Sequence, residues 1–233
     1  MTPEEFSNEF DSLLQTHLLK QGFGNTDIRS FDEYEKSVFL TKAQEEIVKE
    51  IYSGKNPYGE GFENTEEVRR YLAPLVFTKI IVDKLKEDIG LSSNSIFYKL
   101  PDDVWFITYE SVKLNGEDSG CNNGKEILVT PITQDEYYRI MENPFRGPSV
   151  RRALRLDIEG NIVEIITPYS IEGYKVRYLS KPKPIILEEL PDNLSINNET
   201  SISGCELNPA MHRLILERAV RLALVSKAQI NRS

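Results

Sequence analysis

The sequence has few of the residues from which catalytic and metal sites are usually built. Its 233 residues include two histidines, two cysteines and one tryptophan. No Cys-x-x-Cys or His-x-x-x-His pair is present, so the ligand spacing typical of a zinc site is missing. His17 and His212 have no partner spacing that suggests a catalytic triad, and we expect packing or surface roles for them. We therefore predict no catalytic residue, no metal and no cofactor.

Two further absences concern the compartment in which the chain is made. No apolar run approaches the roughly 20 residues needed to span a bilayer, and the opening MTPEEFSNEF lacks the basic and apolar regions of a signal peptide. Cys121 and Cys205 are isolated in polar segments and do not form a disulfide framework. We expect no membrane contact and a reducing cytoplasm as the place of synthesis.

Acidic residues exceed basic ones, and the formal net charge of −9 argues against a non-specific nucleic-acid binder. The charge is unevenly distributed: residues 1–72 have fifteen acidic and eight basic side chains, whereas residues 139–183 have five acidic and nine basic. Such asymmetry is often scatter. The alternative is that an acidic face of one copy meets a basic face of another. The candidate subunit-interface residues are Glu45, Glu46, Arg146, Arg151, Arg152, Lys181 and Lys183.

Hydrophobic periodicity predicts an α+β protein with an N-terminal helical region, a central, mostly antiparallel β-sheet domain and a long C-terminal helix. The boundaries follow changes in composition. We expect helices over residues 1–94, a β-rich body over 95–190, a flexible polar linker over 191–207 and a helix over 208–233. That last helix is apolar almost all round, so it should be buried against the body or against a neighbour. The segment 74–90 fits a helix or a strand.

The stretch from Ser30 to Gly54 is the clearest helix in the sequence. Ser30 and Glu33 have the spacing of a capping box, and Gly54 is placed to end the helix. An apolar stripe that includes Val38, Ile47 and Ile51 should face the chain's own fold. The acidic side of the helix, with Glu45 and Glu46, would then face a neighbouring subunit, and reversing both charges should leave the monomer folded.

Three other segments could carry a function. Asp102 and Asp103 form a carboxylate pair, but the sequence LPDD between two strands is typical of a turn. The sequence NPFRGPSVRRALR could contact a phosphate backbone or an acidic protein face, and it equally fits a partly buried strand with arginines on one face. SKPKPIIL must be extended because of its prolines, which suggests a docking strand.

The order of several motifs resembles a family of virion structural proteins of tailed bacteriophages, notably the crAss-like phages. The motifs are FYKLPDDVWFITYESVKLNG, ILVTPITQDEYYRIMENPFRGPS, RLDIEGNIVEII, GYKVRYLSKPKPIIL and HRLILERAVRLAL. The helix FDEYEKSVFLTKAQEEIV also fits this group, and the similarity covers roughly residues 30–225.

The resemblance implies a non-enzymatic ring or head–tail connector protein of the neck or tail. It implies a homo-oligomeric ring of twelve copies below the portal, in contact with the portal and other ring proteins, in a virion assembled in the host cytoplasm. A passing contact with genomic DNA through Arg151, Arg152 and Arg155 is a smaller alternative. Another alternative is a phage-encoded cytosolic enzyme or nucleic-acid-processing accessory protein that uses Asp102, Asp103 and Glu136.

Overall fold

The computed structural model describes residues 1–20, 31–55, 65–86, 90–191 and 193–230, and the chain divides into two compact units. The helical unit contains Met1–Leu75 and Lys181–Ser233, and the sheet unit contains Val76–Ser180. The sheet unit is therefore one continuous segment, whereas both ends of the chain build the helical unit. The sequence placed these boundaries after residues 94 and 190, where the composition changes. The structure places them where the first strand of the sheet, in chain order, begins and where the last one ends.

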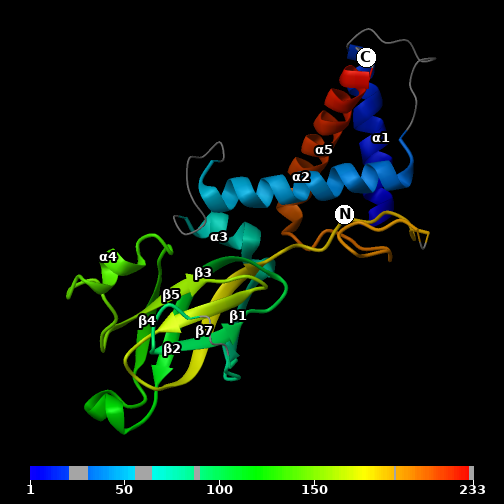
Figure 1. The fold of residues 1–233 in the computed structure, drawn as a ribbon. Helices are drawn as coiled ribbons and strands as arrows, with labels where there is room; N and C mark the ends of the chain where they lie inside the picture. Colours follow the sequence, from blue (N-terminus) through cyan, green and yellow to red (C-terminus); the bar gives the residue numbers. More distant parts are fainter. Residues whose placement is uncertain (21–30, 56–64, 87–89, 192, 231–233) are drawn as a thin grey trace. The chain divides into compact units, whose positions relative to one another are not determined.

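The helical unit is formed by helices that are distant in the sequence. Helix α5 packs on both α2 and α1. Its apolar side chains account for this packing: Ile215, Leu216 and Ala219 are fully buried, whereas Leu214 and Val225 are about half exposed. The elements are α1 (Pro3–Lys20), α2 (Glu33–Ser53), α3 (Glu66–Leu72), the short 3₁₀ helix η1 (Ala73–Leu75) and α5 (Pro209–Ile230) (Figure 1).

Helix α2 begins two residues later than the sequence predicted. Asp32 is the N-cap: its Oδ1 accepts a hydrogen bond from the Glu35 backbone N at 2.7 Å, and the Glu35 side chain accepts one from the Asp32 N at 3.2 Å. The predicted cap, Ser30, lies outside the described residues. The capping-box spacing occurs twice in SFDEYE, and sequence alone did not separate the two. The predicted end is confirmed, because Gly54 adopts the left-handed conformation with φ 73°.

The sheet unit contains one seven-stranded sheet in the order β1-β7-β3-β4-β5-β6-β2, and its pairs are antiparallel except for β4 with β5 (Figure 1). Within the ambiguous segment 74–90, residues Val76–Ile81 form a strand, β1, at one edge. The strands are β1 (Val76–Ile81), β2 (Ser95–Lys99), β3 (Val104–Leu114), β4 (Glu126–Pro131), β5 (Arg152–Asp157), β6 (Ile162–Ile166) and β7 (Ile171–Ser180). The short helix η2 (Glu117–Asn122) precedes β4, and α4 (Tyr137–Met141) follows it.

Apolar and polar side chains share the interior of the sheet unit. Buried residues of β2, β3, β6 and β7 form the main apolar cluster, and Tyr137 and Ile140 hold α4 against Leu154 and Leu156 of β5. Tyr174, on β7, is fully buried and donates a hydrogen bond at 2.7 Å to Glu110 on β3. Because buried polar groups are costly unless paired, this contact helps to fix the strand register.

Residues 181–191 and 193–207 pack into the helical unit, whereas the sequence predicted a flexible linker over 191–207. An isolated bridge pairs Ile186 with Ser203, and a second pairs Ile196 with Glu199. Ile185 and Ile186 are fully buried, and Leu207 is 3% exposed. This segment is therefore an integral part of the helical unit. Its polar composition reflects its turns, in which Asn197 and Asn198 adopt positive φ.

Candidate interaction surfaces

A row of polar side chains on α2 binds the extended segment that the sequence singled out as a docking strand. Ser37, Thr41 and Gln44 recur at helical spacing and are buried. The Leu187 N donates to the Ser37 Oγ at 3.0 Å, the Ile185 N donates to the Thr41 Oγ1 at 3.0 Å, and the Gln44 Nε2 donates to the Lys183 O at 2.7 Å. The segment predicted to dock on a partner, SKPKPIIL, is therefore bound to α2 of its own chain.

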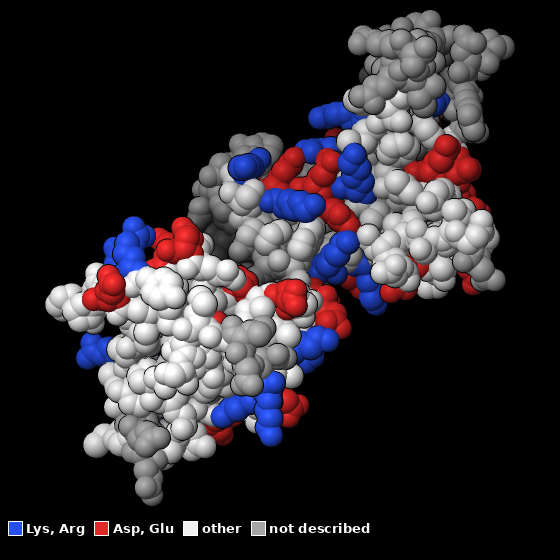
Figure 2. Space-filling model, viewed as in Figure 1, with Lys and Arg blue, Asp and Glu red and all other residues white. Residues whose placement is uncertain are grey.

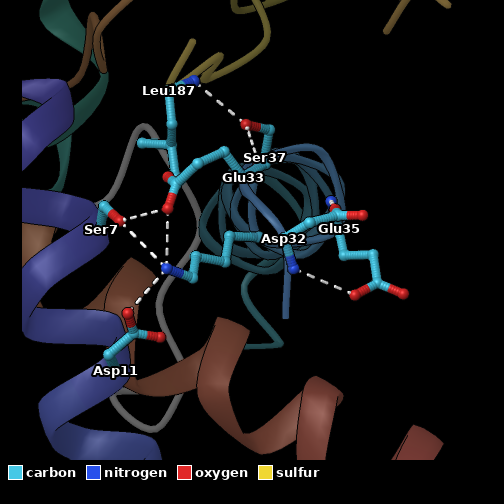
Figure 3. A network of polar contacts seen from close by, with 8 residues as sticks. Ser7, Asp11, Asp32, Glu33, Glu35, Ser37 and Leu187 are labelled. Atoms are coloured by element: carbon cyan, nitrogen blue, oxygen red, sulfur yellow. Dashed lines mark hydrogen bonds and ion pairs between the residues drawn. The ribbon is translucent and has the colours of Figure 1, made fainter. Parts of the chain in front are cut away.

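Lys36 is the centre of a polar network that joins α1 to α2. Its side chain is 3% exposed, and its Nζ lies 2.7 Å from Asp11 Oδ2 and 2.8 Å from Glu33 Oε1. Ser7 accepts a hydrogen bond from the same Nζ and donates one to Glu33. In Figure 3 the side chains of Ser7 and Asp11 on α1 converge with that of Glu33 around this ammonium group. Burial acts to lower the pKa of Lys36, but Asp11 and Glu33 outweigh burial and raise the pKa above its ordinary value of 10.5.

The predicted interface residues of the helical unit all have partners within the chain. Glu45 pairs with Lys181 at 3.2 Å, and Lys183 pairs with Glu206 at 3.5 Å. Arg218 of α5 makes a bidentate pair with Glu50 at 2.8 and 2.9 Å and a longer contact with Glu46 at 3.4 Å. These carboxylates hold α2 to α5 and to the 181–187 segment. Their role between subunits stays a prediction, and charge reversal would now also weaken the monomer.

The arginine-rich segment before and within β5 is divided between surface and interior. Arg146 and Arg151 are exposed, and Arg152 is half-buried with its Nη1 donating to the Arg146 O at 3.3 Å. Arg155 is 8% exposed and lies 3.4 Å from Glu110 in the core. The proposed DNA contact through Arg155 is therefore wrong, because β5 turns this side chain into the sheet unit.

The residues considered for an enzyme are not gathered into one centre. Asp102 pairs with Lys99 at 3.6 Å, Asp103 accepts hydrogen bonds from the Tyr178 hydroxyl, and Glu136 pairs with Arg139. Over the described ranges, no group of three or more His, Cys, Asp or Glu side chains is arranged to hold a metal ion.

The histidines and cysteines also have separate surroundings. His17 and Cys121 are exposed, as expected of surface residues. His212 is buried, with Nδ1 2.8 Å from the Met1 amino group and Nε2 3.2 Å from the Leu207 O. Burial lowers the pKa of His212, and the neighbouring amino group lowers it further. The Cys205 thiol contacts Gln44 Oε1 at 3.2 Å, and burial raises its pKa to about 11.

Sequence reasoning missed the exposed apolar side chains of the sheet unit. Phe145 is 90% exposed, Tyr138 70%, Ile80 65% and Val82 60%. Figure 2 shows a broad face of the sheet unit with little charge, while acidic and basic side chains interleave over α2 and α5. The sequence NPFRGP indicates such exposure, because Phe145 lies between two prolines in a segment too short to fold over the side chain. Exposed apolar groups of this kind mark surfaces for a protein partner.

The arrangement therefore supports binding to a protein partner. Ion pairs and hydrogen bonds hold the helical unit together, and the sheet unit exposes large apolar side chains at its surface. No helix in the described part of the chain is long and apolar enough to cross a membrane.

Comparison with known proteins gives full-length matches. The sequence profile of the family described as "Phage tail ring protein 3/4" matches residues 1–233. The chain is 51% identical over 231 residues to "Ring protein 3" of Bacteroides phage crAss001, covering 99% of this chain and 98% of that protein. It is also 35% identical over 233 residues to "Ring protein 4/5" of the same phage, covering 96% of this chain and 92% of the relative.

Proposed function

The chain belongs to the phage tail ring protein 3/4 family, and on this premise we propose that it is a ring subunit of the neck or tail, assembled below the portal. The single observation that carries the proposal is the family match over all 233 residues, supported by 51% identity to a ring protein that extends over nearly both chains. A structural role in a crAss-like phage virion follows from this membership.

The finer part of the proposal is a closed ring of twelve identical copies that connects head and tail. A cyclic ring requires a heterologous interface, in which one face of a subunit meets a different face of the next. The exposed residues Arg146 and Arg151 and the half-buried Arg152 supply one basic face for such a contact. Glu45, Glu46, Lys181 and Lys183 are partly engaged within the chain and would contribute at the rim of the interface.

The proposed partners are other copies of the chain, the portal and neighbouring ring proteins, in a virion assembled in the host cytoplasm. Of the three arginines predicted to contact genomic DNA, only the exposed Arg151 and the half-buried Arg152 would meet DNA passing through the ring, because Arg155 is buried. Contacts of this kind would be brief and salt-dependent. No enzymatic activity is part of the proposal, since the carboxylates at 102, 103 and 136 each bond a neighbouring side chain.

Electron microscopy of the purified chain, alone and mixed with its portal and neighbouring ring proteins, tests this function. We expect rings with twelve-fold symmetry and a particle mass near twelve times the 26.7 kDa subunit. A protein that stays monomeric under all of these conditions would overturn the proposal. Rings of another symmetry would overturn only the copy number.

A further inference from the structure

One apolar protrusion of the sheet unit is unusually exposed for a soluble protein. Tyr138 and Met141 of α4 and Phe145 of the following loop are 70%, 37% and 90% exposed, and we call these three residues the aromatic knob. Arg146 directly follows Phe145 and is also exposed. Aromatic residues and arginine are the side chains most enriched at the energetic centres of protein interfaces.

The aromatic knob is held in a fixed conformation before any partner binds. The Asn143 side chain accepts a hydrogen bond from the Phe145 N at 2.9 Å, and its carbonyl accepts bonds from Arg146 and Gly147. On the opposite side of α4, Tyr137 and Ile140 are buried in the sheet unit. A rigid aromatic anchor loses little conformational entropy on binding, so these contacts favour affinity.

A groove beside the edge strand β1 offers a matching surface on the same unit. Residues 79–83 and 99–103 line this β1 groove, which has a volume of about 640 Å³. Ile80 and Val82 give it an exposed apolar wall, and Asp83, Asp102 and Asp103 give it three carboxylates against two lysines. The net charge of the groove is therefore negative, whereas the segment that includes the knob and continues into Arg151 and Arg152 is positive.

The two surfaces lie on different sides of the sheet unit. Figure 1 shows α4 on one side of the sheet and β1 on the other. A contact between them in two copies would be heterologous, and heterologous contacts produce a ring when the rotation closes. A contact between two knobs or between two β1 strands would instead be isologous and would stop at a dimer.

We propose that the aromatic knob of one copy inserts into the β1 groove of the next copy, with Phe145 against Ile80 and Val82. Arg146 and Arg151 then face the acidic rim at Asp83 and Asp103. This inference rests on the proposed ring function and identifies the two faces that make the ring close.

Assembly of two matched variants gives the first test, measured as particle mass against protein concentration. Phe145→Ser should raise the midpoint concentration of assembly by about 30-fold, the effect of losing a central interface anchor. Leu214→Ser, which removes an apolar side chain 46% exposed on the helical unit, serves as the control and should leave the midpoint unchanged. Equal midpoints for Phe145→Ser and the original chain would overturn the pairing.

Cysteine cross-linking tests the pairing directly, in a background where the exposed Cys121 is replaced by serine. A mixture of Phe145→Cys and Val82→Cys chains should give a single dimer band on mild oxidation, and each variant alone should give none. The double variant should give a ladder that ends at the full ring. If rings form without these cross-links, the pairing is wrong and the ring function stands. If the unmodified chain forms no ring with any neighbour, both fail.

Discussion

The two units of this protein differ most in how far their apolar side chains are exposed. In the helical unit, buried polar groups such as Lys36, Thr41 and Gln44 have partners in the same unit, and the surface charges of α2 and α5 pair with one another. In the sheet unit, the strands and α4 leave large apolar side chains in water, most of all Phe145 and Tyr138. The helical unit therefore pairs its buried polar groups within itself, and its exposed apolar side chains, such as Leu214 and Val225, are smaller and less exposed than Phe145 and Tyr138.

This difference suggests a division of labour for a ring subunit. The helical unit brings the first and last parts of the chain together, with α1 and α2 packing on α5. The ion pairs of α2 and α5 join parts of the same subunit and are therefore not free to bind a neighbour. The inserted sheet unit presents its two surfaces from one continuous segment, so their spacing depends on strand register and on the packing of α4 against β5. Both statements can be tested separately, because the single tryptophan, Trp105, lies on β3 and reports only on the sheet unit.

The largest expected effect comes from Lys36→Met, which leaves Asp11 and Glu33 without their shared cation. We expect the free energy of unfolding of the helical unit to fall by about 3 kcal/mol, because the bonds of the buried ammonium group to Ser7, Asp11 and Glu33 are lost, and bonds to charged groups are worth about 1.5–3 kcal/mol each. Urea unfolding followed by far-ultraviolet circular dichroism, to which the helices contribute most, should show the loss. The Trp105 fluorescence transition should stay in place.

Lys42→Met is the matched control, since Lys42 is exposed on the same helix. It should leave both transitions unchanged within about 0.5 kcal/mol. Lys36→Met could instead shift the tryptophan transition by as much as the circular dichroism transition. The two units would then unfold together, and they would have no separate stabilities to compare.

A smaller effect separates two tyrosines in the core of the sheet unit. Tyr174 donates a hydrogen bond to Glu110, whereas the buried hydroxyl of Tyr98 has no hydrogen-bond partner among the residues that the structure describes. Tyr174→Phe should cost about 2 kcal/mol, because it removes a bond to a buried charged group. Tyr98→Phe should be neutral or stabilising, because it removes a polar atom that is buried without a partner.

These two substitutions form a matched pair, since both rings are fully buried and their centroids are 5.5 Å apart. The tryptophan transition in urea measures each effect, and circular dichroism should show no change in the helical unit. Equal losses of unfolding free energy for the two variants would mean that the packing around the aromatic side chains, and not the bond to Glu110, decides the effect of each substitution.

Much of the fold could be predicted from the sequence because short-range signals dominate it. Gly54 ends α2, and β-branched and aromatic residues mark β2, β3 and β7, as the sequence predicted. Other features depend on tertiary contacts that no local pattern encodes. Residues 181–187 were recognised as extended, but their partner is the row Ser37, Thr41 and Gln44, more than 130 positions away in the chain.

The candidate surfaces were less predictable than the fold, for a physical reason. Charge alone suggested Glu45 and Glu46, yet a carboxylate on a helix face pairs with whichever cation the fold brings near, here Lys181 and Arg218. Val38 fits the apolar stripe of α2 by spacing but is 37% exposed, because the buried face of the helix is shifted toward Ser37 and Thr41. The segment NPFRGP indicates an exposed Phe145, but the exposure of Tyr138 and Met141 beside it depends on the packing of α4, which no local pattern encodes.

The smallest expected effect is alkaline weakening that differs between the units. The raised pKa of Lys36 means that the folded state holds this proton more tightly, so its stabilisation is complete below pH 10.5 and is lost as the pH rises through the folded pKa. In the sheet unit, burial raises the pKa of Tyr98 to about 12, and stability should fall between about pH 10 and 12. Urea midpoints measured at several pH values should therefore decline in both signals. Lys36→Met should reduce the decline only in the circular dichroism profile, and Tyr98→Phe only in the tryptophan profile. Part of each decline should remain, because the pKa values of Cys205 in the helical unit and of Tyr174 and Tyr178 in the sheet unit are also raised. If Lys36→Met left the helical profile unchanged above pH 10.5, the network around Lys36 would not be the source of its pH dependence.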